Sequence, residues 1–323
     1  MNGPTENSKL PAASGAGLQP DQSRRPLLTR VFRNDTEVRA GWRLLIFLAI
    51  LTAASPIVGV IARHFVHGSP HGYGPGALAA GDGAGLLAAL GAVGVIAMLE
   101  HRSFGDYGLP FRQAFRTRFW FGALWGWASV TLLLLLIRMG GGFYFGTLAV
   151  HSAKTLLYYA AGWAFAFLVV GWFEEFLFRC YPLYTLSTGI GFWPAAIGLS
   201  ALFGAVHLAN PGEEWKGALA AGLIGLFFCF SLRRTGSLWF AVGFHAAWDY
   251  SESFVYSVPD SGIVVHGHLL NSTFRGPAWL TGGRVGPEAS AFVFVVVAIL
   301  LLALHLAYPK ARFQPSSERL PAQ

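Results

Sequence analysis

The chain has 323 residues, enough for two soluble domains, but its composition excludes an ordinary soluble protein. Nine apolar residue types (Ala, Val, Ile, Leu, Met, Phe, Trp, Tyr and Cys) make up 54% of the chain, charged residues make up only 12%, and the mean hydropathy is +0.49. A soluble protein with this many apolar residues would need a larger polar exterior than 12% charged residues can supply. The composition therefore indicates an integral membrane protein. The formal net charge of +7 does not indicate a nucleic-acid binder, because Lys and Arg occur singly or in pairs between apolar stretches.

The N-terminal segment 1–40 lacks the apolar stretch of a secretory signal peptide. It is rich in Pro, Ser, Gly and Asn, and it carries several arginines. We expect a disordered, basic, cytosolic segment here.

Apolar stretches near the roughly 20 residues needed to cross a bilayer recur along the rest of the chain. We predict an all-α polytopic membrane protein with about eight transmembrane helices and a polar site buried among helices 4, 5 and 7. The second span is rich in Gly and Ala, and the fifth is short. The predicted spans are 43–62, 82–99, 119–137, 157–178, 194–209, 215–232, 238–256 and 288–307.

The distribution of Lys and Arg is consistent with these spans, because positive residues accumulate in cytosolic loops. The predicted cytosolic segments hold most of the positive residues, and the opposite loops hold few. Both termini are therefore expected in the cytosol of what we take to be a bacterial cell-membrane protein. After segment 1–40, we divide the chain into spans 1–3 (41–150), a site-bearing core (151–256), an extracytosolic loop (257–287), a last helix (288–308) and a cytosolic tail (309–323).

Ionisable residues inside the predicted spans are concentrated at three places, and each one costs a few kcal/mol and needs a partner or a function. The three segments are Glu174-Glu175-Phe-Leu-Phe-Arg179, Phe203-Gly-Ala-Val-His207 and His245-Ala-Ala-Trp-Asp249.

Helical spacing places the two glutamates of the first segment on different faces of the helix. Glu175 and Arg179 are four residues apart and lie on one face, so they can pair, whereas Glu174 is rotated by about 100°. A carboxylate without a local counter-ion in an apolar region is a candidate general base, general acid or metal ligand. The alternative is a helix end with three solvated charges.

The same spacing brings the other polar residues onto shared faces. It places Phe203 with His207, and it places Asp249 where it can orient the imidazole of His245. Glu252 continues that face one turn further, and we expect it near the aqueous rim.

The depths of the polar residues allow them to meet. If the fourth helix continues past Arg179 to about Leu186, with a bend at Pro182, Glu174 lies roughly 18 Å from the cytosolic side. On the same arithmetic the two histidines and the aspartate lie roughly 10–20 Å from that side. The sequence therefore predicts one site built from three helices.

These three motifs, in this order, resemble those of the CPBP family of intramembrane endopeptidases, which includes the type II CAAX prenyl proteases and bacterial Abi proteins. The family is recognised by EExxxR, FxxxH and HxxxN/D, and the resemblance covers about residues 155–256. It implies a protease in which Glu174 and His207 activate a water. It also implies that His245 and Asp249 position the scissile carbonyl or stabilise its oxyanion, with Glu175, Arg179 and Phe203 in supporting roles.

Asp249 stands where Asn is frequent in this family, and this raises the question of a metal. A carboxylate repels developing negative charge, so Asp249 must be protonated, directed at His245 or bound to a cation. A catalytic zinc would draw its ligands from Glu174, His207, His245 and Asp249. We favour the metal-free, glutamate-type mechanism and expect no cofactor.

Other functions fit the sequence less well. The chain has no HExxH or GxGD motif, and a rhomboid-like pair of Ser200 with His245 leaves the glutamates unexplained. A proton-coupled transporter would show matching broken helices, and none is evident. A catalytically silent scaffold or immunity protein is a further alternative. The expected partners are a membrane-associated peptide or protein substrate and the lipid bilayer, and not nucleic acid.

The charge distribution predicts the topology of the chain. A reporter fused at residue 145, after the third span, should be extracytosolic, and one fused at residue 235 should be cytosolic. Paired alkaline phosphatase and green fluorescent protein fusions at both points measure this. The opposite result at either point contradicts the predicted order of spans.

Overall fold

The structure is a computed structural model that describes residues 32, 38–66, 74–149, 152–210 and 212–315. Most of the predicted N-terminal segment 1–40, and the end of the predicted tail from residue 316, lie outside the described residues.

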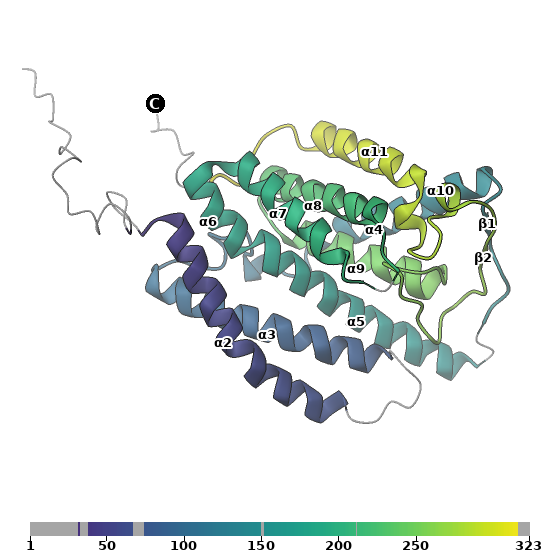
Figure 1. The fold of residues 1–323 in the computed structure, drawn as a ribbon, viewed down its shortest axis with the longest axis horizontal. Coiled ribbons are helices and arrows are strands. Elements are labelled where there is room, and N and C mark those ends of the chain that lie inside the picture. The colour runs from purple at the N-terminus through teal and green to yellow at the C-terminus, as the bar shows by residue number, and fades with distance from the viewer. Residues whose placement is uncertain (1–31, 33–37, 67–73, 150–151, 211, 316–323) are drawn as a thin grey trace, which may run out of the picture. The chain divides into compact units, whose positions relative to one another are not determined.

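The described part of the chain from residue 40 onward is a helical bundle with one short β-ribbon (Figure 1). The strands β1 (Phe143–Tyr144) and β2 (Thr273–Phe274) are antiparallel, with Phe143 opposite Phe274. The helices are α2 (Ala40–Val66), α3 (Pro75–Leu99), η2 (Phe111–Gln113), α4 (Thr117–Met139), α5 (Ala153–Arg179), α6 (Tyr181–Ile190), α7 (Phe192–His207), α8 (Trp215–Thr235), α9 (Trp239–Tyr250), the π-helix η3 (Ser251–Val255), α10 (Ala278–Thr281), η4 (Pro287–Ala289) and α11 (Ala291–Ala307).

The helices confirm an all-α polytopic membrane protein. Within the described residues, five segments are long and apolar enough to cross a bilayer: Ala40–Val60, Pro75–Leu99, Thr117–Met139, Ala153–Ile190 and Trp215–Thr235. They correspond to predicted spans 1–4 and 6, while the shorter apolar helices α7 and α11 correspond to spans 5 and 8. The predicted seventh span is divided between α9 and η3. The number of eight spans therefore stays a prediction.

The fourth predicted helix is broken, not bent. α5 ends at Arg179, Cys180 has the non-helical backbone angle ψ of −105°, and α6 begins at Tyr181. Pro182 falls in the first turn of α6, where its missing N–H is harmless, whereas in a continuous helix it would clash with the preceding turn. The proline that we expected to bend the helix instead starts a new one.

α9 lies at the centre of the bundle, in contact with α4, α5 and α8, and α3 covers α5 on a further side (Figure 1). α4 and α9 touch through their backbones: a Cβ atom added to Gly122 would lie 2.0 Å from the Phe240 carbonyl oxygen, and one added to Gly243 would lie 2.1 Å from that of Phe119. Glycine is therefore required on both helices, as expected for membrane helices that pack closely.

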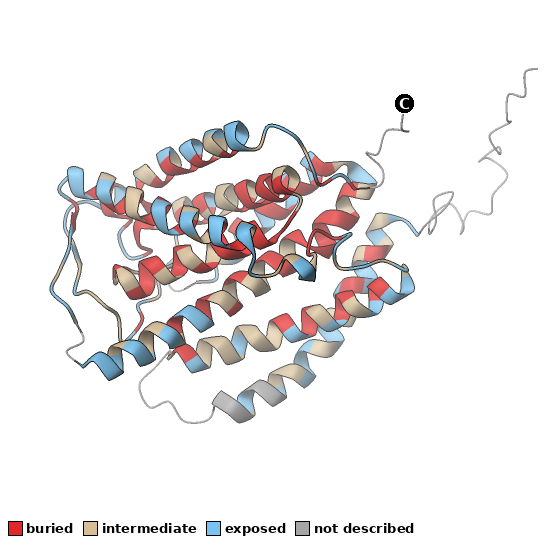
Figure 2. Ribbon diagram, turned by 180° about the vertical axis from the view of Figure 1, so that it is seen from behind, coloured by how far each residue is buried: buried red, intermediate tan, exposed pale blue. Residues whose placement is uncertain are grey.

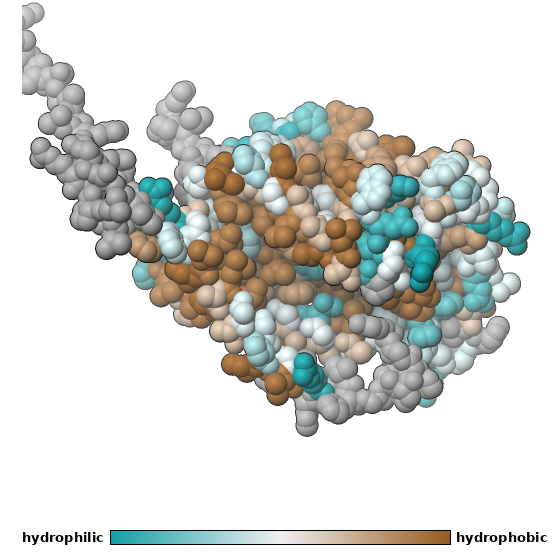
Figure 3. Space-filling view, viewed as in Figure 1, coloured by the Kyte–Doolittle hydropathy of each residue, from teal (hydrophilic) through white to brown (hydrophobic). Residues whose placement is uncertain are grey.

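Burial and surface polarity agree with insertion in a bilayer. Figure 2 shows that buried residues concentrate on the central helices, and that α2 has few of them. The face seen in Figure 3 is mostly hydrophobic, with hydrophilic residues abundant toward the end that carries β1 and β2. Large apolar side chains such as Leu157, Ile197 and Leu302 are exposed, as expected for helices that face lipid.

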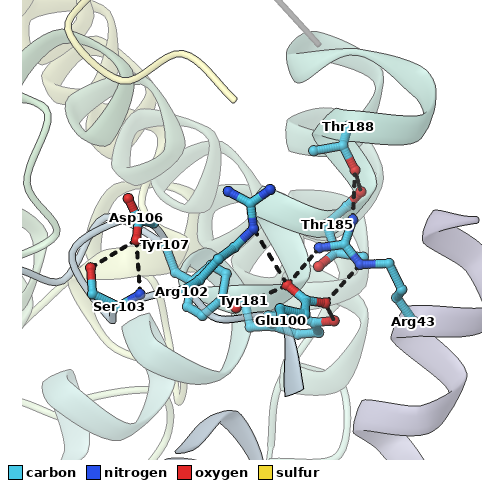
Figure 4. Close-up of polar contacts among 9 residues, drawn as sticks. All are labelled: Arg43, Glu100, Arg102, Ser103, Asp106, Tyr107, Tyr181, Thr185 and Thr188. Atoms are coloured by element: carbon cyan, nitrogen blue, oxygen red, sulfur yellow. Dashed lines mark hydrogen bonds and ion pairs between the residues drawn. The ribbon is translucent and has the colours of Figure 1, made fainter. Parts of the chain in front are cut away.

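Glu100 at the end of α3 ties several segments together (Figure 4). Its carboxylate accepts hydrogen bonds from Arg43 Nε and Nη2, both at 2.8 Å, and from the hydroxyls of Tyr107 and Tyr181, both at 2.9 Å. Arg102 Nε lies 3.8 Å away. One acidic residue thus joins α2, α3, α6 and the 101–116 loop.

We expect Glu100→Ala to destabilise the protein by about 3–5 kcal/mol, because Arg43 would be left buried without its carboxylate. Tyr107→Phe removes one of several donors and should cost only about 1 kcal/mol. Thermal unfolding of the purified variants in detergent compares the two. Equal melting temperatures would show that Glu100 does not hold these segments together.

Candidate active site

The predicted site residues line one cavity of about 920 Å³ between the helices. Glu174 at the end of α5, His207 at the end of α7, and His245 and Asp249 on α9 all contribute to its wall. Phe203, from the same helix as His207, also lines it. The structure thus brings together residues from the three sequence motifs.

The predicted pair of Glu175 and Arg179 is confirmed. Arg179 Nη1 lies 3.0 Å from Glu175 Oε1, and both side chains are fully buried. The guanidinium also lies 4.0 Å from the centre of the Phe203 ring, a cation–π contact that explains the support expected from Phe203. Gly225 on α8 leaves the space for it, because an added Cβ atom would lie 2.4 Å from Arg179 Nη2.

His245 is held between three carboxylates. Its Nδ1 lies 3.0 Å from Glu175 Oε1, and since an ionised carboxylate only accepts hydrogen bonds, Nδ1 carries the proton. Its Nε2 lies 3.7 Å from Glu174 Oε2 and 3.6 Å from Asp249 Oδ2. These two distances are longer than a hydrogen bond, so a water or a carbonyl oxygen has room beside Nε2.

Asp249 is thus directed at His245, one of the three settings that the sequence left open for it. The Phe228 ring stacks on the imidazole, with centroids 5.4 Å apart and planes 16° apart. The position of His245 is therefore fixed by its acidic partners and by this ring.

His207 presents its other nitrogen to the cavity. Its Nδ1 lies 2.7 Å from the backbone carbonyl oxygen of Phe203. A carbonyl only accepts, so Nδ1–H is the donor and Nε2 keeps its lone pair. The imidazole can therefore accept a proton or a hydrogen bond from a water in the cavity.

The two neighbouring glutamates have opposite settings. The Glu175 side chain is fully buried against Arg179, whereas 27% of the Glu174 side chain is exposed, and Glu174 lines the cavity. Glu174 has no Lys or Arg partner among the described residues. The basic side chain beside it is that of His245, whose Nε2 lies 3.7 Å from Glu174 Oε2.

The candidate zinc ligands do not gather as a zinc site requires. Zinc bonds N and O ligands at about 2.0–2.2 Å, so its ligand atoms lie roughly 3.4 Å apart. His245 Nε2 approaches that spacing with Glu174 and with Asp249. Among the described residues, however, the set that brings three ligand atoms within 4.8 Å of one another contains none of the four candidates.

Asp82 on α3 is a cavity residue that the motif search missed. It lines the same cavity as Glu174 and is close enough for the two carboxylates to repel each other. It is the one charged residue of the 75–99 helix, and a search for lone ionisable residues in spans would have found it.

Glu252 does not lie near an aqueous rim, as we expected, but is fully buried. The π-helix η3 widens the turn after α9 and carries it into the protein interior. The loop residue Asp260 lies close by, and burial together with the charges of Asp249 and Glu288 raises its pKa well above the ordinary value.

Ser200, the candidate of the rhomboid-like alternative, is a core residue. It is buried, and its hydroxyl contacts the Cys229 sulfur at 3.7 Å. The cavity wall does not include it.

The comparisons with known proteins give one family. Residues 155–251 match the family described as type II CAAX prenyl endopeptidase Rce1-like. No curated protein and no solved structure matches the chain significantly. The matched segment contains all three motifs, from Glu174 to Asp249.

The buried pair predicts a defect in folding. Arg179→Ala or Glu175→Ala should cost about 3–5 kcal/mol, because each leaves a buried charge without its partner. Both variants should accumulate less in membranes and have lower melting temperatures than Glu174→Gln, the matched change at the neighbouring residue. Normal abundance and full stability of Arg179→Ala would show that the pair is dispensable.

Proposed function

We propose that this membrane protein is an intramembrane endopeptidase of the CAAX-protease type, in which a water activated between Glu174 and His207 hydrolyses the peptide bond. The match of residues 155–251 to the Rce1-like family supports this reaction. The observation that carries the proposal is the opposite setting of Glu174 and Glu175. One carboxylate lines the cavity, and the other is fully buried, with Arg179 and His245 both against its Oε1 atom.

Glu174 acts as the general base. It is the member of the pair that a water can reach, and it has no Lys or Arg partner within the described residues to fix its lone pairs. A water bound to Glu174 passes a proton to it as the oxygen attacks the carbonyl carbon. The same carboxyl then delivers that proton to the leaving amine.

His207 holds the attacking water from the other side. Its proton is on Nδ1, so the lone pair of Nε2 accepts the second hydrogen bond of the water. Two acceptors then hold one water in the orientation for attack. Less entropy is therefore lost on reaching the transition state.

His245 stabilises the oxyanion. Glu175 fixes the ring from behind through Nδ1, and Nε2, between Glu174 and Asp249, donates a hydrogen bond to the oxyanion when the ring carries both protons. A preorganised donor in an apolar surrounding is the arrangement that stabilises developing negative charge most strongly. In this role Asp249 is a positioning residue for His245.

A membrane-associated peptide or protein is the substrate that this mechanism requires. The family match of residues 155–251 and the long apolar helices support a substrate of this kind. The proposed reaction does not depend on whether the substrate is prenylated.

We expect Glu174→Gln and His207→Ala each to lower proteolysis by about 10²–10⁴-fold, because each removes a group that activates the water. Glu214→Gln, an exposed carboxylate outside the cavity, is the matched control and should cleave as the wild type does. Membrane proteomes of cells that express each variant identify peptides cut only by active protein. Purified Glu174→Gln that retains robust proteolysis on such a peptide contradicts the mechanism.

Asp249→Asn separates the metal-free mechanism from a zinc mechanism in the same assay. Asn keeps the size of the side chain and a hydrogen-bond acceptor, so much of the activity should remain, and chelators should have little effect. Loss of both bound zinc and activity on this substitution would favour the metalloprotease.

A further inference from the structure

Three carboxylates that the proposed mechanism does not use gather beside the cavity. They come from Glu252 in η3, Asp260 in the following loop and Glu288 in η4, and one oxygen from each lies within 4.8 Å of the other two. Asp260 and Glu288 line the cavity, and Glu252 lies behind them, fully buried. Three segments, η3, the loop that follows it and η4, thus contribute one acidic group each.

Hydrogen bonds compensate two of the three carboxylates. Glu288 accepts from Trp248 Nε1 at 3.1 Å, and from the Ser261 backbone N–H and hydroxyl at 3.0 and 2.9 Å. Asp260 accepts from the Ser253 hydroxyl at 3.1 Å. These donors orient both groups.

Glu252 has no such compensation. Neither of its carboxylate oxygens has a hydrogen-bond partner among the described residues, although the side chain is fully buried. An uncompensated buried carboxyl is costly, and one of its oxygens lies within reach of the other two acidic groups. No Lys or Arg of the described chain forms an ion pair with any of the three. The cluster therefore lacks a positive charge.

A hard divalent cation is what this cluster fits. All three ligand groups are carboxylates, which suit calcium or magnesium better than zinc because no nitrogen or sulfur ligand is present. Calcium bonds oxygen at about 2.3–2.6 Å, so two ligands on opposite sides of it lie roughly 5 Å apart. Three oxygens within 4.8 Å fit one calcium ion, with water and main-chain carbonyls completing its shell.

We propose that Glu252, Asp260 and Glu288 bind a calcium ion beside the catalytic cavity. The ion joins η3 to the 257–287 loop and to η4, and so it fixes the loop residues that form one wall of the cavity. This site is separate from the candidate zinc ligands and does not depend on the proposed proteolytic mechanism.

The test uses the full chain, purified in detergent and stripped with a chelator. Calcium should raise the melting temperature by at least about 3 °C, because a ligand that binds only the folded state stabilises it. Magnesium at the same concentration should raise it less. Terbium, which replaces calcium, should emit when tryptophan is excited, since Trp248 contacts the Glu288 ligand. Added calcium should displace terbium and so reduce this emission.

Glu252→Gln and Asp260→Asn should each weaken calcium and terbium binding at least about tenfold, since each removes a ligand charge. Glu214→Gln is the matched control at an exposed carboxylate, and Glu174→Gln is the control for the candidate zinc ligands. Both should keep the wild-type response. If Glu252→Gln does not fold, the loop variant Asp260→Asn decides.

Three outcomes overturn the proposal. The first is a wild-type protein that binds neither calcium nor terbium, which would mean that protons neutralise the cluster. The second is binding that Asp260→Asn leaves unchanged. The third is a magnesium response equal to or larger than that of calcium.

Discussion

The burial of charge in an apolar bundle is the constraint on which the site depends. Arg179 and Glu175 are both fully buried, and neither would be tolerated there without the other. The pair does more than neutralise itself. Phe203 of α7 packs on the guanidinium, His245 of α9 binds the Glu175 carboxylate, and Gly225 of α8 leaves the space that the arginine fills. One ion pair on α5 thus sets the positions of three other helices.

This arrangement gives two adjacent glutamates different environments. A helix turns by about 100° per residue, so the neighbour of a buried carboxylate points elsewhere, here into the cavity. Glu175 contacts His245 Nδ1 from the buried side, and Glu174 lies at the cavity. The buried carboxylate and the cavity-lining carboxylate are separated by a single peptide unit.

Much of the fold and the centre of the site followed from the sequence, because both depend on local periodicity. Apolar length located the long helices, and the four-residue spacing paired Glu175 with Arg179 and His245 with Asp249. Failures came where tertiary structure decided the result. The break at Cys180 replaced the expected bend.

The acidic cluster was also beyond the reach of periodicity. A π-helix turned Glu252 inward, and a loop without a regular pattern returned Asp260 beside it. Asp82 meets Glu174 only because α3 packs against α5, and no spacing within one helix reports such a contact.

The glycine contact between α4 and α9 also shows how differently the helices around the cavity are packed. The backbones touch at Gly122 and Gly243, and a larger side chain at either position would push the two helices apart. The face of α9 that carries His245 and Asp249 is therefore backed by a close backbone contact with α4. α2, by contrast, is the least buried of the long helices and lines the cavity through Gly59 and Arg63. Of the long helices, α2 therefore loses the least buried surface if it moves.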